Sequence, residues 1–272
     1  MTLSCLPVSY FGQIIQGEKS VAQWAAEAAA LELDAVDLSI LFFKDRSPGR
    51  LKSIREDVES VGVRVALVNT YPELTHPDSQ ERKRQMSQLT VDIDTAAQLG
   101  ARAVRVTSGQ AYPETSRSDG IDWVLEGLAS AAEVATSCDI ELVYENHSQP
   151  GIWDYPDFNL ATDIFLEIAE GLKDTSTRLL FDTANPLVYG DEPLEVLEPI
   201  IDQVVWVHAA DIGVRGALTP VVIGTGIVPF DEIFTRLHQA HFDGGISLEE
   251  ASGQGPAGVE QAVTFVRETW KK

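Results

Sequence analysis

Four side chains that can bind a metal occur in the second half of the chain, each about one strand–helix unit after the one before. Glu145, Asp182, His208 and Glu249 follow one another at 37, 26 and 41 residues, and each closes a short apolar run. Three carboxylates and one imidazole brought to one point would repel one another and lose hydration. A divalent cation removes that conflict, because it accepts carboxylate oxygens together with one neutral imidazole nitrogen. The pattern therefore predicts a metal site formed by these four residues.

The donor set is mostly hard oxygen, which favours Mn²⁺, Mg²⁺ or Co²⁺, while the single histidine keeps Zn²⁺ as an alternative. The types of donor do not distinguish among these ions, and Mn²⁺ is the ion that we expect first. Taken one at a time, an acid at the end of a strand is more often a helix N-cap or a solvated loop residue than a metal ligand. Four in succession are much less easily explained in that way.

Elements that could position these groups alternate along the whole chain. A short β-branched run is followed by an amphipathic helical pattern about every 30 residues. The expected strands are Leu3–Val8, Ala35–Leu38, Val63–Val68, Ala103–Thr107, Ile140–Glu145, Arg178–Asp182, Val204–His208 and Ile246–Glu249. The expected helices are Ser20–Leu33, Pro48–Ser60, Ser79–Leu99, Trp123–Ser137, Leu160–Gly171, Leu194–Ile200, Phe230–His241 and Pro256–Thr269.

Eight such units in series predict an α/β fold, a (β/α)8 TIM barrel that forms a single domain over residues 1–272. The alternative is an open, doubly wound sheet, which carries a glycine-rich phosphate loop after its first strand. The segment Val8–Gly12 holds no such loop. In a barrel the four candidate ligands lie at the C-terminal mouth of the strands, where reactive groups gather.

Composition and charge narrow the classes of function. The net charge of −22 opposes binding to nucleic acid or to anionic lipid. No apolar run reaches the roughly 18 residues that cross a bilayer, and the first residues do not read as a signal peptide. Cys5 and Cys138 fit no metal or disulfide spacing. We expect a cytoplasmic protein that takes a small molecule as its partner.

The C-terminal half resembles the sugar phosphate isomerase/epimerase family, the xylose isomerase-like barrels that include ketose 3-epimerases, inosose dehydratases and endonuclease IV-type enzymes. The matching stretches are Glu145–His147, Phe181–Asn185, His208–Asp211 with Gly224–Gly226, and Asp243–Glu249. The resemblance implies the same four ligands and carbohydrate metabolism as the setting. Because relatives are often dimers or tetramers, it is also compatible with a homo-oligomer.

Two positions depart from the family pattern. Ala210 stands where a lysine usually follows the ligating histidine, and Asn185 stands where 3-epimerases place a second histidine against the substrate. Asn185 can hydrogen-bond a hydroxyl or a carbonyl, but it cannot carry a proton. The resemblance thus implies the class of enzyme and leaves the substrate open.

The chemistry that the resemblance implies is isomerisation or epimerisation of a keto-sugar or related polyol through an enediolate, stabilised by the cation. Glu145 and Glu249 are the expected acid/base pair, with His147 as a further proton carrier or as a residue that orients Glu145. Loss of a leaving group from the same intermediate would give a dehydratase or lyase acting on an inosose or a 3-keto-glycoside. A non-catalytic sugar-binding barrel is the further alternative. An abasic-site endonuclease is disfavoured by the acidity and by only five histidines.

Several polar and aromatic residues in the expected loops could contact a substrate, although loops and surface ion pairs use the same residue types. Those we assign to substrate binding are Asn185, Arg215, Tyr71, Gln110 and Trp153. Glu250 alternates with Glu249 along the last strand, so we expect it outside the metal site, facing solvent.

Overall fold

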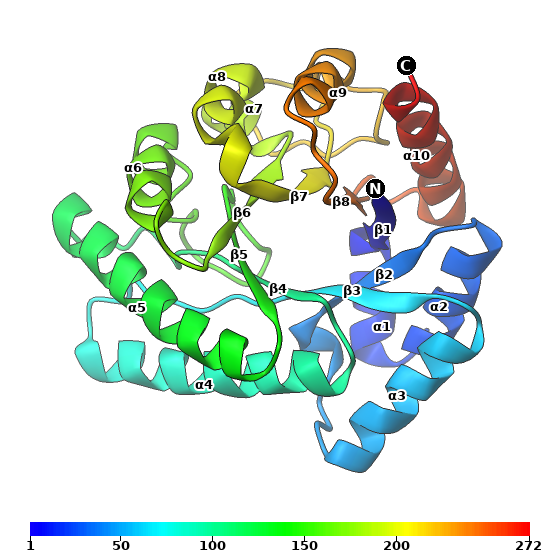
Figure 1. Ribbon diagram of the computed structural model, residues 1–272, viewed down its shortest axis with the longest axis horizontal. Coiled ribbons are helices and arrows are strands. Elements are labelled where there is room, and N and C mark those ends of the chain that lie inside the picture. The colour runs from blue at the N-terminus through cyan, green and yellow to red at the C-terminus, as the bar shows by residue number, and fades with distance from the viewer.

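A computed structural model describes residues 1–272, and it contains one eight-stranded parallel sheet curled into a nearly closed barrel (Figure 1). The strands are β1 (Thr2–Leu6), β2 (Ala35–Ser39), β3 (Arg64–Asn69), β4 (Ala103–Val106), β5 (Glu141–Glu145), β6 (Arg178–Asp182), β7 (Val204–Ala209) and β8 (Gly245–Glu249). Their order is β1-β8-β7-β6-β5-β4-β3-β2, so every neighbouring pair is hydrogen-bonded except β1 and β2. The predicted barrel is confirmed.

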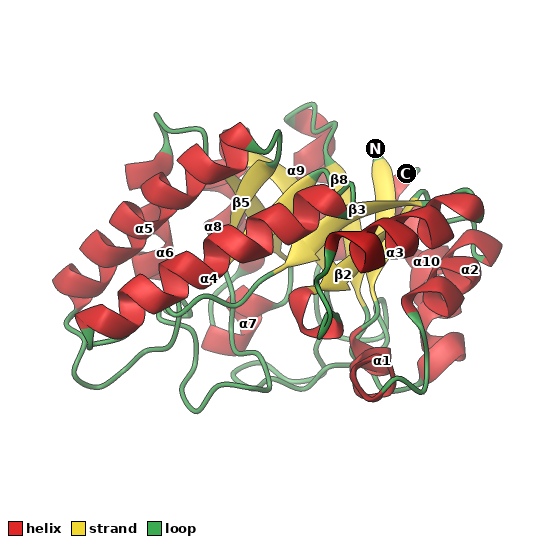
Figure 2. Cartoon of the chain, turned by 90° about the horizontal axis from the view of Figure 1, so that it is seen from below, coloured by secondary structure: helices red, strands yellow, loops and turns green.

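Helices surround the barrel, and the loops that follow the strands gather on the side away from the N-terminus (Figure 2). The α-helices are α1 (Phe11–Gln16), α2 (Val21–Ala30), α3 (Pro48–Ser60), α4 (Ser79–Gln98), α5 (Arg117–Ser137), α6 (Thr162–Leu172), α7 (Asn185–Tyr189), α8 (Pro193–Leu197), α9 (Phe230–Gln239) and α10 (Gly255–Trp270). None of them combines the length and the apolar character needed to cross a bilayer.

The helix boundaries differ from expectation where local capping decides them. Helix α5 begins six residues earlier than the expected Trp123, because Ser116 caps it by accepting a hydrogen bond from the backbone N–H of Asp119 at 3.1 Å. The short helices α1 and α7 were not predicted, since five or six residues are too few to show a helical period.

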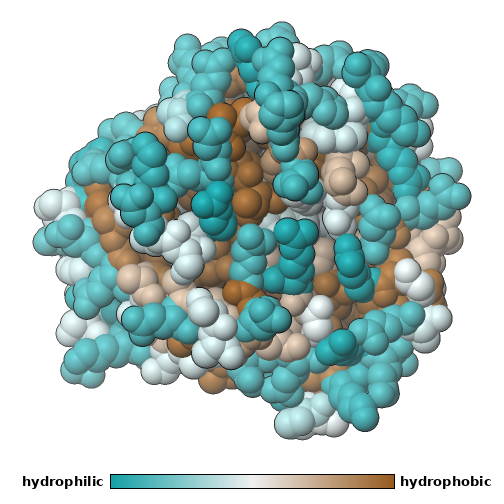
Figure 3. All heavy atoms as spheres, viewed as in Figure 1, coloured by the Kyte–Doolittle hydropathy of each residue, from teal (hydrophilic) through white to brown (hydrophobic).

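Two apolar clusters hold the fold together. The larger one lies between the strands and the surrounding helices, and the smaller one fills the inside of the barrel with mostly small or aliphatic side chains around Trp206. Gly245 makes room for that indole, because a Cβ at this position would lie 1.9 Å from the ring. The face seen in Figure 3 is largely hydrophilic, with hydrophobic atoms in the furrows between polar side chains, which agrees with the strong net charge.

Candidate metal centre

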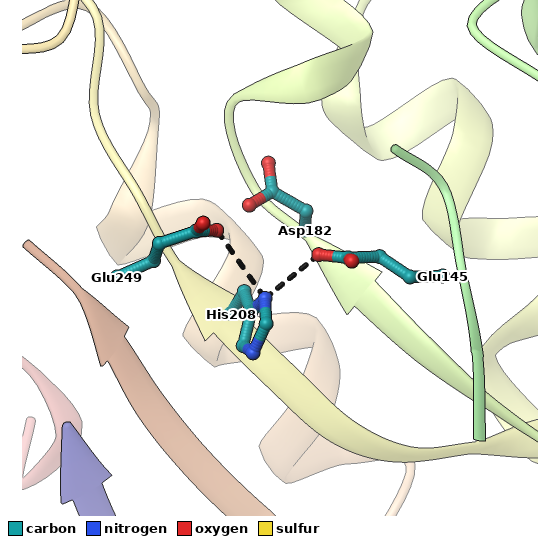
Figure 4. Close-up of side chains that lie close together, drawn as sticks. All are labelled: Glu145, Asp182, His208 and Glu249. Carbon is teal, nitrogen blue, oxygen red and sulfur yellow. Dashed lines mark hydrogen bonds and ion pairs between the residues drawn. The ribbon is translucent and has the colours of Figure 1, made fainter. Parts of the chain in front are cut away.

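The four predicted ligands meet at the C-terminal ends of β5 to β8. Glu145, Asp182 and Glu249 are the last residues of β5, β6 and β8, and His208 pairs in register with Asp182. One ligand atom from each residue lies within 4.8 Å of the others. Figure 4 shows the four side chains directed into one space. Parallel strands bring their ends to a single rim, so residues about one strand–helix unit apart in the sequence lie close together in space.

Hydrogen bonds and one ion pair orient the ligands around this space. His208 Nδ1 lies 2.7 Å from Glu145 Oε1 and 3.3 Å from Glu249 Oε2 (Figure 4). Asp182 Oδ1 accepts from two backbone N–H groups of the following turn, at 2.7 and 2.8 Å. Asp182 Oδ2 is buried without any hydrogen-bond partner. This carboxylate oxygen lies beside two further acids and an imidazole. A divalent cation bound between them would give it a partner, so these four side chains fit a metal site.

The pKa shifts of the clustered residues also favour a metal site. Burial would raise the pKa of Glu145, but Arg105 and His208 outweigh it and lower that pKa to about 2. Burial and the neighbouring carboxylates raise the pKa of Asp182 well above its usual range. Burial would lower the pKa of His208, yet Glu145 and Glu249 hold it well above its usual value. The raised pKa values of His208 and Asp182 favour their protonated forms, so a cation binding here would compete with protons.

Arg105 also belongs to this centre, although we did not predict it from the sequence. Its side chain is 1% exposed, and its Nε lies 3.0 Å from Glu145 Oε2 while donating a hydrogen bond to Asn69 Oδ1 at 2.9 Å. Nη1 donates to the carbonyl of Thr70 at 3.0 Å, and the guanidinium lies over the ring of Tyr71. An arginine inside an otherwise apolar strand was the available signal, because such a charge is buried only when it is paired.

His147 lies on the cavity wall beside the ligands. Its Nδ1 is 3.1 Å from Asp157 Oδ2, and its ring meets Trp153 edge-on with 6.1 Å between centroids. The other nitrogen, Nε2, is thus the one left for a ligand in the cavity. The sequence left open whether His147 faces substrate or supports Glu145, and the structure shows that His147 lines the cavity.

A cavity of about 420 Å³ opens above the cluster. Its polar lining includes Tyr71, Arg105, His147, Asp182, Asn185 and Glu249. Two of the predicted substrate-binding residues, Tyr71 and Asn185, are therefore at the cavity. Asn185 Nδ2 already donates to the carbonyl of Asn146 at 2.9 Å, so its amide oxygen is the atom left to meet a ligand.

The other three predicted substrate-binding residues do not line this cavity. Gln110 Oε1 accepts from the backbone N–H groups of Asp154 and Tyr155, so it supports the loop after β5. Trp153 is buried behind His147. Arg215 is half-exposed and pairs with Glu192 at 2.6 Å. Loop residues are placed by contacts distant in sequence, which a motif does not encode.

The expectation that Glu250 faces solvent is wrong. Glu250 is fully buried, and its carboxylate accepts hydrogen bonds from Ser9 Oγ at 2.5 Å and from the backbone N–H of Ser252 at 3.0 Å. The loop that follows β1 covers this side of β8, so the acid ties the first and last strand ends together. It lies outside the metal cluster, as predicted.

The fold and the geometry of the site define a general class of protein. Its members are parallel barrels with a cluster of acids and a histidine at the C-terminal mouth of the strands. Residues 25–269 match the xylose isomerase-like TIM barrel family, and the chain belongs to that family. It is 25% identical over 256 residues to a putative hydroxypyruvate isomerase of Streptomyces coelicolor, covering 90% of both chains. It is 27% identical over 150 residues to an inosose dehydratase of Bacillus thuringiensis, which spans 48% of this chain and 47% of that protein. The structure of an L-ribulose 3-epimerase superposes with a TM-score of 0.81 at 18% identity, over 100% of this chain and 95% of the other.

Proposed function

We propose that this protein is a divalent-metal-dependent isomerase or epimerase that moves a proton beside the carbonyl of a keto-sugar or related polyol. The observation that carries the proposal is the convergence of four ligand atoms within 4.8 Å of one another, beside a cavity that Asp182 and Glu249 line. The similarity to a putative hydroxypyruvate isomerase over 90% of both chains supports it, since that name also denotes proton movement next to a carbonyl.

The residues divide into those that hold the ion and those that face the substrate. Glu145, Asp182, His208 and Glu249 would hold the ion, and Mn²⁺ is the ion we propose. When bound, a divalent ion supplies Lewis-acid stabilisation of negative charge on the carbonyl oxygen. Arg105 keeps Glu145 ionised and fixed in position.

Two groups are placed to move protons. The side chain of Glu249 is 21% exposed and lines the cavity, so it can take a proton from a bound substrate. His147, held by Asp157, lines the same cavity and can return one. Glu145 is fully buried and does not line the cavity. Its predicted share in proton transfer stays a prediction, and its position suits the holding of the ion better.

A dehydratase is the second candidate, favoured by the His147–Asp157 pair. A histidine that can donate a proton to a departing hydroxyl suits elimination from the same carbonyl-stabilised anion. The similarity to an inosose dehydratase over about half of each chain supports this alternative.

Deuterium exchange separates these candidates. Mn²⁺-loaded protein would be incubated in D₂O with ketoses, hydroxypyruvate, inososes and 3-keto-glycosides, and the products analysed by mass spectrometry. Deuterium beside the carbonyl with the carbon skeleton retained supports an isomerase or epimerase, and loss of water supports the dehydratase. Glu249→Gln, assayed for bound metal as well as for turnover, reports on the acid facing the cavity. If fully metal-loaded protein binds a sugar of the panel and exchanges no hydrogen, a non-catalytic sugar-binding barrel replaces both candidates.

A further inference from the structure

A polar layer lies inside the barrel at the level of His208, one of the candidate metal ligands. Ser4 of β1, Asp37 of β2 and Ser247 of β8 are all fully buried. Ser247 pairs in register with Ser4 on one side and with His208 on the other, so these residues share one level of the barrel. Asp37 lies where the pairing of β2 with β3 shifts register, because Val36 pairs with Val65 and Asp37 with Leu67, which leaves Ala66 of β3 as the extra residue. Barrel interiors are usually filled by aliphatic residues, so a carboxylate in this layer needs a partner.

Within the layer, only some of the buried polar atoms have a hydrogen-bond partner. Ser247 Oγ donates a hydrogen bond to Asp37 Oδ2. Asp37 Oδ1, Ser4 Oγ and His208 Nε2 are each buried and have no hydrogen-bond partner. Leaving a buried polar group without a hydrogen bond is costly, so three such groups on one layer call for a shared partner.

The orientation of His208 directs Nε2 toward this layer. Its Nδ1 lies between Glu145 and Glu249, and Nε2 is on the opposite side of the ring, away from both carboxylates (Figure 4). Burial raises the pKa of Asp37 to about 6, while Ser247, the charge of His208, Ser4 and the backbone N–H of Leu67 oppose the rise.

We propose that Asp37 is a positioning residue for the metal-binding imidazole, accepting the Nε2 proton of His208 through one water molecule that Ser4 also binds. A buried water makes about three hydrogen bonds, which is the number of unpartnered atoms present. A proton fixed on Nε2 leaves the lone pair of Nδ1 for the ion and holds the ring plane still. This inference rests on the metal site of the proposed function.

The test measures metal binding and the state of the histidine, and it needs no substrate. Asp37→Asn keeps the shape of the side chain and removes its charge. We expect Mn²⁺ affinity, measured by calorimetry on folded protein, to fall 10–100-fold. In the Zn²⁺-loaded native protein, ¹⁵N spectra should show His208 protonated at Nε2 with a slowly exchanging proton, and this signature should weaken in the variant. Thr177→Val, which removes another buried and unpartnered hydroxyl, is the matched control and should change neither readout.

The outcomes are separable. Native protein that binds no Mn²⁺ would contradict the metal site itself. Native protein that binds Mn²⁺, with Asp37→Asn binding within twofold and showing the same Nε2 signal, would overturn the role of Asp37 alone, even if that variant melts at a lower temperature. Should Asp37→Asn fail to fold, Ser4→Ala decides. A several-fold loss of affinity with faster Nε2 proton exchange supports the proposal, and unchanged values overturn it.

Discussion

Replacing Arg105 with methionine should lower the unfolding free energy of the metal-free protein by about 3–5 kcal/mol, the usual loss when one partner of a buried ion pair is removed. The guanidinium Nε lies 3.0 Å from Glu145 Oε2, and both side chains are essentially inaccessible to solvent. At an effective dielectric constant of 20, opposite charges at that distance attract by about 5 kcal/mol. Methionine fills much of the space of the arginine side chain. The loss of unfolding free energy therefore reports mainly on the charge of Glu145, which is left buried without a partner.

The pH dependence of this loss follows from the direction of the shift. The pKa of Glu145 is lowered to about 2 in the fold, so its stabilising contribution is present above the ordinary glutamate pKa and disappears as pH falls toward 2. Urea unfolding with EDTA, followed by tryptophan fluorescence, should therefore show the full loss at pH 7. With Mn²⁺ bound the loss should shrink, because the ion also compensates the charge of Glu145.

Arg102→Met is the matched control for this experiment. Arg102 precedes the same strand, its side chain is 53% exposed, and it lies 3.8 Å from Glu141. A surface pair of this kind contributes less than about 1 kcal/mol. If Arg105→Met loses no more than the control, attraction and desolvation cancel in the buried pair, and the claim that Arg105 holds Glu145 ionised is refuted.

Three further predictions follow from the same geometry. Mn²⁺ affinity should rise with pH, because His208 and Asp182 have raised pKa values and must release protons to bind the ion, and binding that releases no protons in calorimetry would contradict this. His147→Asn should lower turnover about 10²–10⁴-fold and leave Mn²⁺ affinity within a few-fold, whereas equal losses of both would indicate a structural role. Gly245→Ala should destabilise the fold by about 1–3 kcal/mol in urea, since its Cβ would strike the indole inside the barrel. Gly12→Ala, with no atom within 4 Å of the new Cβ, should cause no loss, and equal behaviour of the two variants would refute the packing argument.

The sequence alone determined the barrel and the convergence of its four candidate ligands. Strands and helices can be recognised from the local periodicity of apolar residues. Eight alternating strand–helix units have few arrangements other than a barrel that bury their apolar faces. Once the strands run parallel, the residues that end β5 to β8 must meet at one rim. Glu145, Asp182, His208 and Glu249 could therefore be placed together without knowing a single contact.

Only the tertiary structure decided which other groups join them. Arg105 reaches Glu145 across 40 residues, and Asp37 meets Ser247 across 210, through the closure of the barrel. Gln110 and Arg215 looked like substrate contacts, yet loop packing commits both elsewhere. Such pairings depend on strand register, barrel curvature and loop path, which arise from the sum of many distant contacts. Local periodicity records which face of an element is apolar, and it carries no information about which buried polar groups will find one another.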